Sequence, residues 1–381
     1  MIEKYYSGVI EQIYNRIGKE TRNIVMANYS NDFSIENLEV IRRYQSNEDN
    51  VFFAYSEFSY NTLVGAYEPF LDIICNMHRR FIGGSFDDFQ KECGVYYLHR
   101  QVLNSYYETG ECFREETVLL NEVAYEQRRM TMAIADMLKK LSEVKPLMIV
   151  INRFQMASKS SIETIKYLID NPCANIGIVL GVNAIVKGTD STVEVWDRIV
   201  ESLEDRSAIY YIGSAGPLKN NVKTTNDDEL YITMNFEQSI QEASNIMEFL
   251  DFEQAKRGCR IIEHKLKFED AWIDEKSLRR FYMVYARTSV LLGEMSKAIE
   301  LTNEFKALIP ENDSEHYLSL YYFMKGTCYM YQGKLEKAGN SAKSAYDYAV
   351  LAEDDTLIFK AELLSVMIKM SGWYNIFFCV Q

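Results

Sequence analysis

Short apolar runs and amphipathic stretches alternate along the first half of the chain. The run "LMIVI" at 147–151 contains no polar residue, which is typical of a strand buried on both faces of a sheet. Residues 116–141 repeat apolar side chains at helical intervals, which predicts one face of an amphipathic helix. In "SSIETIKYLID", Ser160 precedes Glu163 at the spacing of a capping box, which marks a helix start. The expected strands are 23–27, 51–55, 147–151, 176–181 and 208–213. Strands separated by helices predict βαβ units and a mostly parallel sheet.

Residues 213–229, "GSAGPLKNNVKTTNDDE", interrupt this pattern. Gly, Pro, Asn, Thr and Asp dominate the stretch, and no apolar period continues through it. We therefore expect a domain boundary here. The prediction is an α/β domain over 1–212, a linker over 213–229 and an all-α domain over 230–381.

The chain after this linker has helical periodicity and is similar to itself. Small residues recur 40 positions apart at Ala286 and Gly326, at Gly293 and Gly333, and at Ala298 and Ala338, with partial matches at Ala255 and Gly372. Small residues let paired helices approach closely, and the glycines are expected to end the first helix of each pair. The pattern resembles tetratricopeptide repeats, although its period exceeds the ~34 residues of that family. We expect a solenoid of helical hairpins.

The last residues, "WYNIFFCVQ", are apolar where the terminal unit of a solenoid needs a polar cap. Either the array ends against a partner, or the sequence is a piece of a longer protein. We favour the second interpretation.

Composition narrows the class of protein. The apolar fraction of 48% and charged fraction of 25% are those of an ordinary soluble protein. A net charge of −14, with no Lys/Arg-rich block, argues against nucleic-acid binding. The sequence lacks a signal peptide and any run of 18 apolar residues, so we expect a cytoplasmic protein without membrane contact.

Candidate catalytic and metal-binding motifs are few. The seven cysteines form no CxxC pair. We interpret Cys75 and Cys259 as buried thiols rather than as metal ligands paired with His78 and His264. No GxSxG motif and no Ser/His/Asp triad pattern occurs among the four histidines.

The residues that follow the strand 147–151 carry the clearest family signal. Asn152 and Arg153 come first, and "FQMASKSS" follows them. Together with "AYEPFLDII" at 66–74, this frame resembles the ATPase domain of STAND-class P-loop NTPases, the AAA-like domain of large LuxR-type regulators. The resemblance covers approximately residues 5–212. In that family two acids stand where this chain has Asn152 and Arg153, and an Arg lies near the end of the fourth strand, where this chain has Asn183.

The resemblance also places the phosphate loop, which should follow the strand 23–27. A working loop reads GxxxxGK[ST], and its glycines, Lys and hydroxyl hold the phosphates and Mg²⁺. Here the stretch is "ANYSNDFS": Ala27 and Asp32 replace the glycines, Phe33 replaces the Lys, and Ser34 is retained. Loss of the Lys, the glycines and the acid pair together implies loss of ATP hydrolysis. We hypothesise that Asp32 and Arg153 pair across the empty site; alternatively, both side chains point into solvent.

These observations lead to one functional expectation and two alternatives. We expect a non-catalytic, STAND-like regulatory protein that binds a protein partner or ligand through its helical repeats or its apolar C-terminal end, as a homo-oligomer or with another protein. No metal and no cofactor is expected. The alternatives are a switch ATPase that binds ATP and Mg²⁺ through atypical loops, and a truncated LuxR-type transcription regulator without its effector domain.

Overall fold

The computed structural model describes residues 2–29, 38–46, 50–58, 63–112, 120, 122–183, 199–201, 203, 209–212, 235–268, 273–312 and 314–378. The chain divides into two compact units. Unit 1 contains Met1–Val118, Glu122–Asn235 and Ser244–Gln254, and unit 2 contains Leu119–Asn121, Phe236–Ala243 and Ala255–Gln381. The stretch 213–229 lies outside the described residues, so a linker there stays a prediction.

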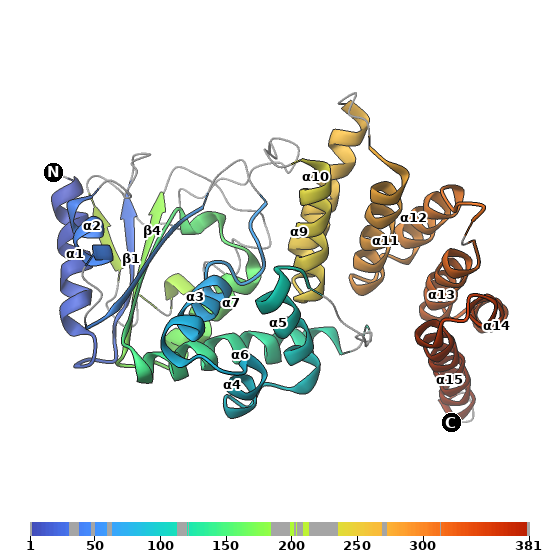
Figure 1. Ribbon diagram of the computed structural model, residues 1–381, viewed down its shortest axis with the longest axis horizontal. Coiled ribbons are helices and arrows are strands. Elements are labelled where there is room, and N and C mark those ends of the chain that lie inside the picture. The colour runs from blue at the N-terminus through green and yellow to red at the C-terminus, as the bar shows by residue number, and fades with distance from the viewer. Residues whose placement is uncertain are drawn as a thin grey trace. The chain divides into compact units, whose positions relative to one another are not determined.

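Unit 1 is built on a parallel sheet whose strand order is β2-β3-β4-β1-β5 (Figure 1). Its strands are β1 (Ile24–Tyr29), β2 (Phe52–Glu57), β3 (Leu147–Asn152), β4 (Ile176–Asn183) and β5 (Ile209–Ile212). All five expected strands are present, and the first four end one or two residues later than the apolar runs do. Apart from Val182, the extra residues are polar or aromatic, and they form the carboxyl edge of the sheet.

Helices cover both faces of this sheet (Figure 1). One face carries α1 (Ile2–Arg16) and α2 (Glu39–Ser46). The other face carries α3 (Phe70–Met77), α6 (Val123–Val144) and α7 (Lys159–Asp170), with the π-helix η1 (His78–Ile82), α4 (Phe86–Glu92) and α5 (Tyr97–Thr109) beside them. Every residue of β3 is buried, as expected for a central strand covered by helices on both sides.

Two expected helix boundaries are wrong. The helix predicted over 116–141 is α6, which begins at Val123 and continues to Val144, because the chain first becomes extended at Lys145, the residue before Pro146. Ser160 does not cap α7. The cap is Ser158, whose backbone is extended and whose hydroxyl oxygen accepts a hydrogen bond from the Ser161 amide.

The C-terminal half is helical throughout its described part. It contains α9 (Phe236–Glu248), α10 (Phe252–Phe268), α11 (Glu275–Leu291), α12 (Met295–Ala307), α13 (Ser314–Tyr331), α14 (Leu335–Leu351) and α15 (Asp355–Phe378). Within unit 2, α13 packs against α14, and α14 packs against α15 (Figure 1). The structure therefore combines an α/β unit with an all-α region, a coarse arrangement compatible with a P-loop-like fold.

Four helix–helix turns share one backbone geometry. The middle residue of each three-residue turn has a positive φ, at Leu250, Gly293, Gly333 and Glu353. In each turn the amide of the next residue donates a hydrogen bond to the carbonyl five residues before it, for example Glu294 to Ser289 and Lys334 to Tyr329. This is the Schellman arrangement that closes a helix end. Gly293 and Gly333 therefore end α11 and α13 as predicted.

The other repeat positions give a mixed outcome. The small residues Ala255, Ala286, Ala298 and Ala338 are completely buried. A Cβ on Gly326 would lie only 3.0 Å from Leu364 Cδ2, so the close approach expected there is present. Gly372 does not end a helix, because α15 continues through it to Phe378. A single glycine costs a helix only ~1 kcal/mol, which the turns on either side can offset. The tetratricopeptide class itself stays a prediction.

Candidate functional site

The carboxyl ends of the parallel strands bring together the residues that sequence reasoning singled out. Glu57 at the end of β2 is aligned with Asn152 at the end of β3, and Tyr29 at the end of β1 is aligned with Asn183 at the end of β4. Asn28 and Asn152 are completely buried. Ligand sites of open α/β sheets lie outside this edge, so it is the first candidate site.

Arg153 is the first residue after β3, and its backbone lies in the left-handed region with φ of 54°. Its amide donates a hydrogen bond of 2.9 Å to Asn152 Oδ1, which fixes this turn. The side chain forms an ion pair with Glu57, with 3.3 Å between Nη1 and Oε1. The Tyr55 hydroxyl donates to the other oxygen of the Glu57 carboxylate. Both carboxylate oxygens of Glu57 are thus engaged at the edge where β2 and β3 end.

Sequence reasoning missed Glu57. The residue follows the apolar run "VFFAY" by two positions, and only the strand register shows that it faces Asn152. A signal was present, since a carboxylate at the end of a strand next to a predicted central strand shares that strand's edge. The hypothesised pair of Arg153 with Asp32 falls on a residue outside the described part of the chain. Among the described residues, Arg153 forms an ion pair with Glu57.

The remaining predicted site residues lie as follows. Ala27 is a buried residue of β1 rather than the start of a loop, because the strand continues to Tyr29 and pairs with both β4 and β5. Asn183 is the last residue of β4. Phe33 and Ser34 lie outside the described residues.

Unit 1 has a second polar centre at the first turn of α7. The Ser160 amide donates a 2.9 Å hydrogen bond to Asp251 Oδ2, and the Gln254 amide is 3.4 Å from Asp251 Oδ1. Asp251 is only 3% exposed. A carboxylate at this position satisfies amides at the starts of two helices, α7 and α10, and interacts favourably with both helix dipoles. An internal side chain therefore occupies the start of α7.

The segment Ser244–Gln254 that carries Asp251 is bound to the rest of unit 1 along its length. Asn245 accepts a hydrogen bond from the Cys112 amide and donates one to the Gly110 carbonyl. The remaining contacts are Gln127 Nε2 to the Leu250 carbonyl at 2.7 Å and Gln254 Nε2 to the Val64 carbonyl at 3.0 Å. These interactions hold Leu250 at a φ of 68°, a backbone conformation that is unfavourable for leucine.

A buried turn before α3 completes this centre. The Ser160 hydroxyl accepts a hydrogen bond from the Tyr67 amide, and the Ser161 hydroxyl donates one to the Glu68 carbonyl. The Glu68 carboxyl accepts from the Gly65 amide at 2.8 Å. Burial raises the pKa of Glu68, the Gly65 hydrogen bond opposes that rise, and the nearby Asp72 adds to it. The fold therefore favours the protonated form of Glu68.

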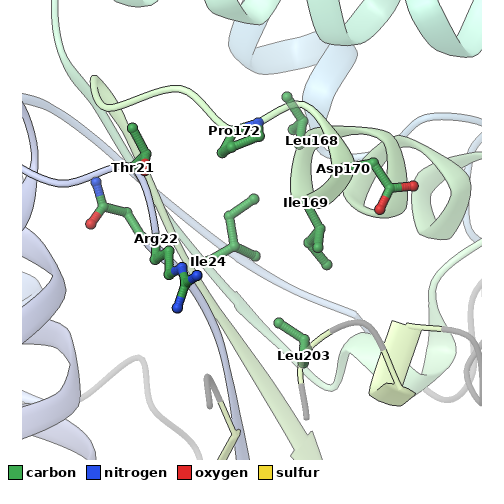
Figure 2. A pocket seen from close by; sticks show the side chains of 9 residues that line it. Thr21, Arg22, Ile24, Leu168, Ile169, Asp170, Pro172 and Leu203 are labelled. Carbon is green, nitrogen blue, oxygen red and sulfur yellow. The ribbon is translucent and has the colours of Figure 1, made fainter. Parts of the chain in front are cut away.

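A cavity of about 390 Å³ lies at the opposite, amino end of β1 (Figure 2). Ile24, Leu168, Ile169, Pro172 and Leu203 surround it, and Arg22 and Asp170 lie on different sides of it. Its lining is mostly apolar. Of the proposed nucleotide-site residues that the structure describes, Ala27, Asn152, Arg153 and Asn183 do not line it.

The cysteines that sequence analysis singled out, Cys75 and Cys259, are buried thiols. Cys75 is buried, and burial raises the pKa of its thiol to about 12. His78 lies within an aromatic cluster, with Nδ1 3.1 Å from the Tyr107 hydroxyl, and burial lowers the pKa of its imidazole. Cys259 is completely buried. Within the part of the chain that the structure describes, no three His, Cys, Asp or Glu side chains gather as a metal site.

Two further results bear on function. No helix in the described ranges is both long and apolar enough to cross a membrane. Neither the known protein-family models nor the curated proteins include a match to this chain.

Proposed function

We propose that this protein is a non-catalytic, STAND-like regulatory protein, in which the α/β unit is a pseudo-ATPase and the helical repeats bind a protein partner or ligand. The observation that carries the proposal is the Arg153–Glu57 ion pair at the carboxyl edge of the sheet. In the family that the sequence resembles, the corresponding position supplies acids for Mg²⁺ and for the attacking water.

The charges at this edge argue against metal-assisted hydrolysis. Mg²⁺ needs oxygen ligands held in near-octahedral geometry, and protein sites usually supply one or two carboxylates. Glu57 is a carboxylate, but the Arg153 guanidinium lies 3.3 Å from one oxygen and the Tyr55 hydroxyl binds the other. A metal ion would have to displace a cation that already neutralises this charge. Asn152, the next side chain along the edge, is buried and uses its carbonyl oxygen to bind the Arg153 amide.

The sequence of the phosphate-loop stretch also disfavours phosphoryl transfer. Asp32 would bring a negative charge to a polyphosphate, and Phe33 cannot supply the cation that a phosphate loop uses. Two separate segments therefore lack the charges that phosphoryl transfer needs. The helical half of the chain, with its close-packed small residues, provides the partner-binding part of the proposal.

A restoration experiment tests this assignment. The natural chain is compared with a variant carrying Asp32→Gly, Phe33→Lys and Arg153→Glu, and ATP–Mg²⁺ is titrated into each in a calorimeter. We expect saturable binding only in the restored variant, because it regains the cation of the loop and an acid at the end of β3. Saturable binding of ATP–Mg²⁺ by the natural chain itself would overturn the proposal and favour the switch-ATPase alternative.

A further inference from the structure

The helix α15 is apolar on two opposite faces. Leu357, Ala361, Leu364 and Ile368 form one stripe, and all four are buried, with Leu364 and Ile368 packed in a cluster with Met330, Ala338 and Ala342. A second stripe consists of Phe359, Leu363, Val366 and Met370, whose side chains are 60%, 42%, 49% and 56% exposed. At 3.6 residues per turn the two stripes are about 160° apart around the helix. The second stripe therefore faces away from α13 and α14.

The second stripe has the spacing of a helix–helix seam. Its members are separated by four, three and four residues, which is the a/d pattern of a heptad. A surface helix normally has one apolar face and one polar face, and a helix that is apolar on two sides is usually covered on both. Four large apolar side chains in one row thus predict a partner helix.

The charges beside this stripe identify the partner. Glu362 and Lys369 are both exposed and lie seven residues apart on the same flank of the stripe. Suppose that a second α15 lies antiparallel across the stripe, on a two-fold axis between Leu363 and Val366. Leu363 of each copy then meets Val366 of the other, and Phe359 meets Met370. In this register the Glu362 side chain of each copy lies opposite Lys369 of the other, so opposite charges meet twice.

A parallel arrangement would lose this match. Equivalent residues would then meet, and Glu362 would lie opposite Met367, so that Glu362 and Lys369 would no longer face each other. The opposite charges that would meet are those of Asp355, in the first turn of α15 before the stripe begins, and Lys360. Other helices could fit the apolar stripe, but the antiparallel copy also satisfies the charges. We propose that this chain self-associates through the Phe359–Leu363–Val366–Met370 stripe of α15 as an antiparallel, two-fold symmetric dimer. The proposal depends on the helical half alone, and it stands whether or not the α/β unit binds nucleotide.

Sedimentation equilibrium of the full chain tests the proposal, over concentrations of about 5 to 300 µM, where a small helix–helix interface would associate. We expect a monomer–dimer equilibrium. Leu363→Glu, which places a charge in the seam, should weaken dimerisation by about 100-fold or more. Tyr5→Glu is the control, because Tyr5 is 62% exposed on α1 in unit 1, and it should leave the equilibrium unchanged.

Charge exchange tests the antiparallel register. Glu362→Lys and Lys369→Glu should each weaken the dimer by roughly 3- to 10-fold, because each creates two like-charge pairs. The double variant should restore the natural affinity. A chain that is monomeric throughout this range would overturn the proposal and leave the stripe to a different helix. A dimer that survives Leu363→Glu, or that the double variant fails to restore, would also contradict it.

Discussion

Replacement of Asp251 is the sharpest test of how unit 1 is held together. Its carboxylate accepts hydrogen bonds from the Ser160 amide at 2.9 Å and from the Gln254 amide at 3.4 Å, and the side chain is 3% exposed. Asp251→Ala removes both acceptors and leaves two helix-start amides without water to replace them. The short bond to a charged group is worth about 1.5–3 kcal/mol, and loss of the α10 cap adds about 1 kcal/mol. We expect the free energy of unfolding to fall by about 2.5–4 kcal/mol.

The assay is urea unfolding followed by far-ultraviolet circular dichroism, together with hydrogen exchange of the first turn of α7. Asp251→Asn keeps one acceptor oxygen but loses the charge, so it should cost about half as much. Ser85→Ala is a matched control. Ser85 caps α4 by accepting from the Asp88 amide at 3.2 Å, but it is exposed and serves one helix, so its loss should cost about 0.5–1 kcal/mol. An Asp251→Ala variant no less stable than Ser85→Ala, with unchanged exchange in α7, would refute this reasoning.

Two more predictions concern protonation and packing. Because burial raises the pKa of Glu68, its contribution to stability is complete below the unfolded pKa of 4.5 and is lost as the pH rises through the folded pKa. Glu68→Gln should therefore be more stable than the natural chain at neutral pH in urea unfolding, with the difference vanishing in acid; a pH-independent difference would contradict this. Gly326→Ala should lower the free energy of unfolding by about 1 kcal/mol, because the new methyl would meet Leu364 Cδ2 at 3.0 Å. Gly339 lies on an exposed part of α14, and a Cβ added there would have nothing within 4 Å, so Gly339→Ala should raise the free energy of unfolding by about 0.5–1 kcal/mol. If both glycine variants changed the free energy of unfolding in the same direction, packing against Leu364 would not explain the effect of Gly326→Ala.

Local patterns in the sequence predict the elements of this fold well. The uninterrupted apolar run at 147–151 becomes the fully buried β3, and alternation with amphipathic segments correctly implies a parallel sheet. The glycines at 293 and 333 end their helices because a positive φ is needed there. Gly372 looks similar in sequence, but the helix continues through it.

Contacts between distant segments were not predictable in the same way. The pairing of Arg153 with Glu57 depends on the register of β2 against β3, which the sequence of neither strand specifies. Asp251 reaches Ser160 across 91 positions, and nothing near either residue indicates the other. Three serines compete to cap α7, and only the backbone conformation shows that Ser158 does so. The helices and strands could therefore be predicted from the sequence, but the side-chain contacts at the candidate sites could not.

Calorimetric titration of ATP–Mg²⁺ into the natural full chain tests the central claim most directly. Ser34→Ala serves as the matched variant, since Ser34 is the one residue that the phosphate-loop stretch shares with a working motif. A pseudo-ATPase should show no saturable binding up to millimolar ATP, and the traces of the two proteins should be identical. Saturable binding in the micromolar range that Ser34→Ala abolishes would contradict it, and would show that the site still holds a nucleotide.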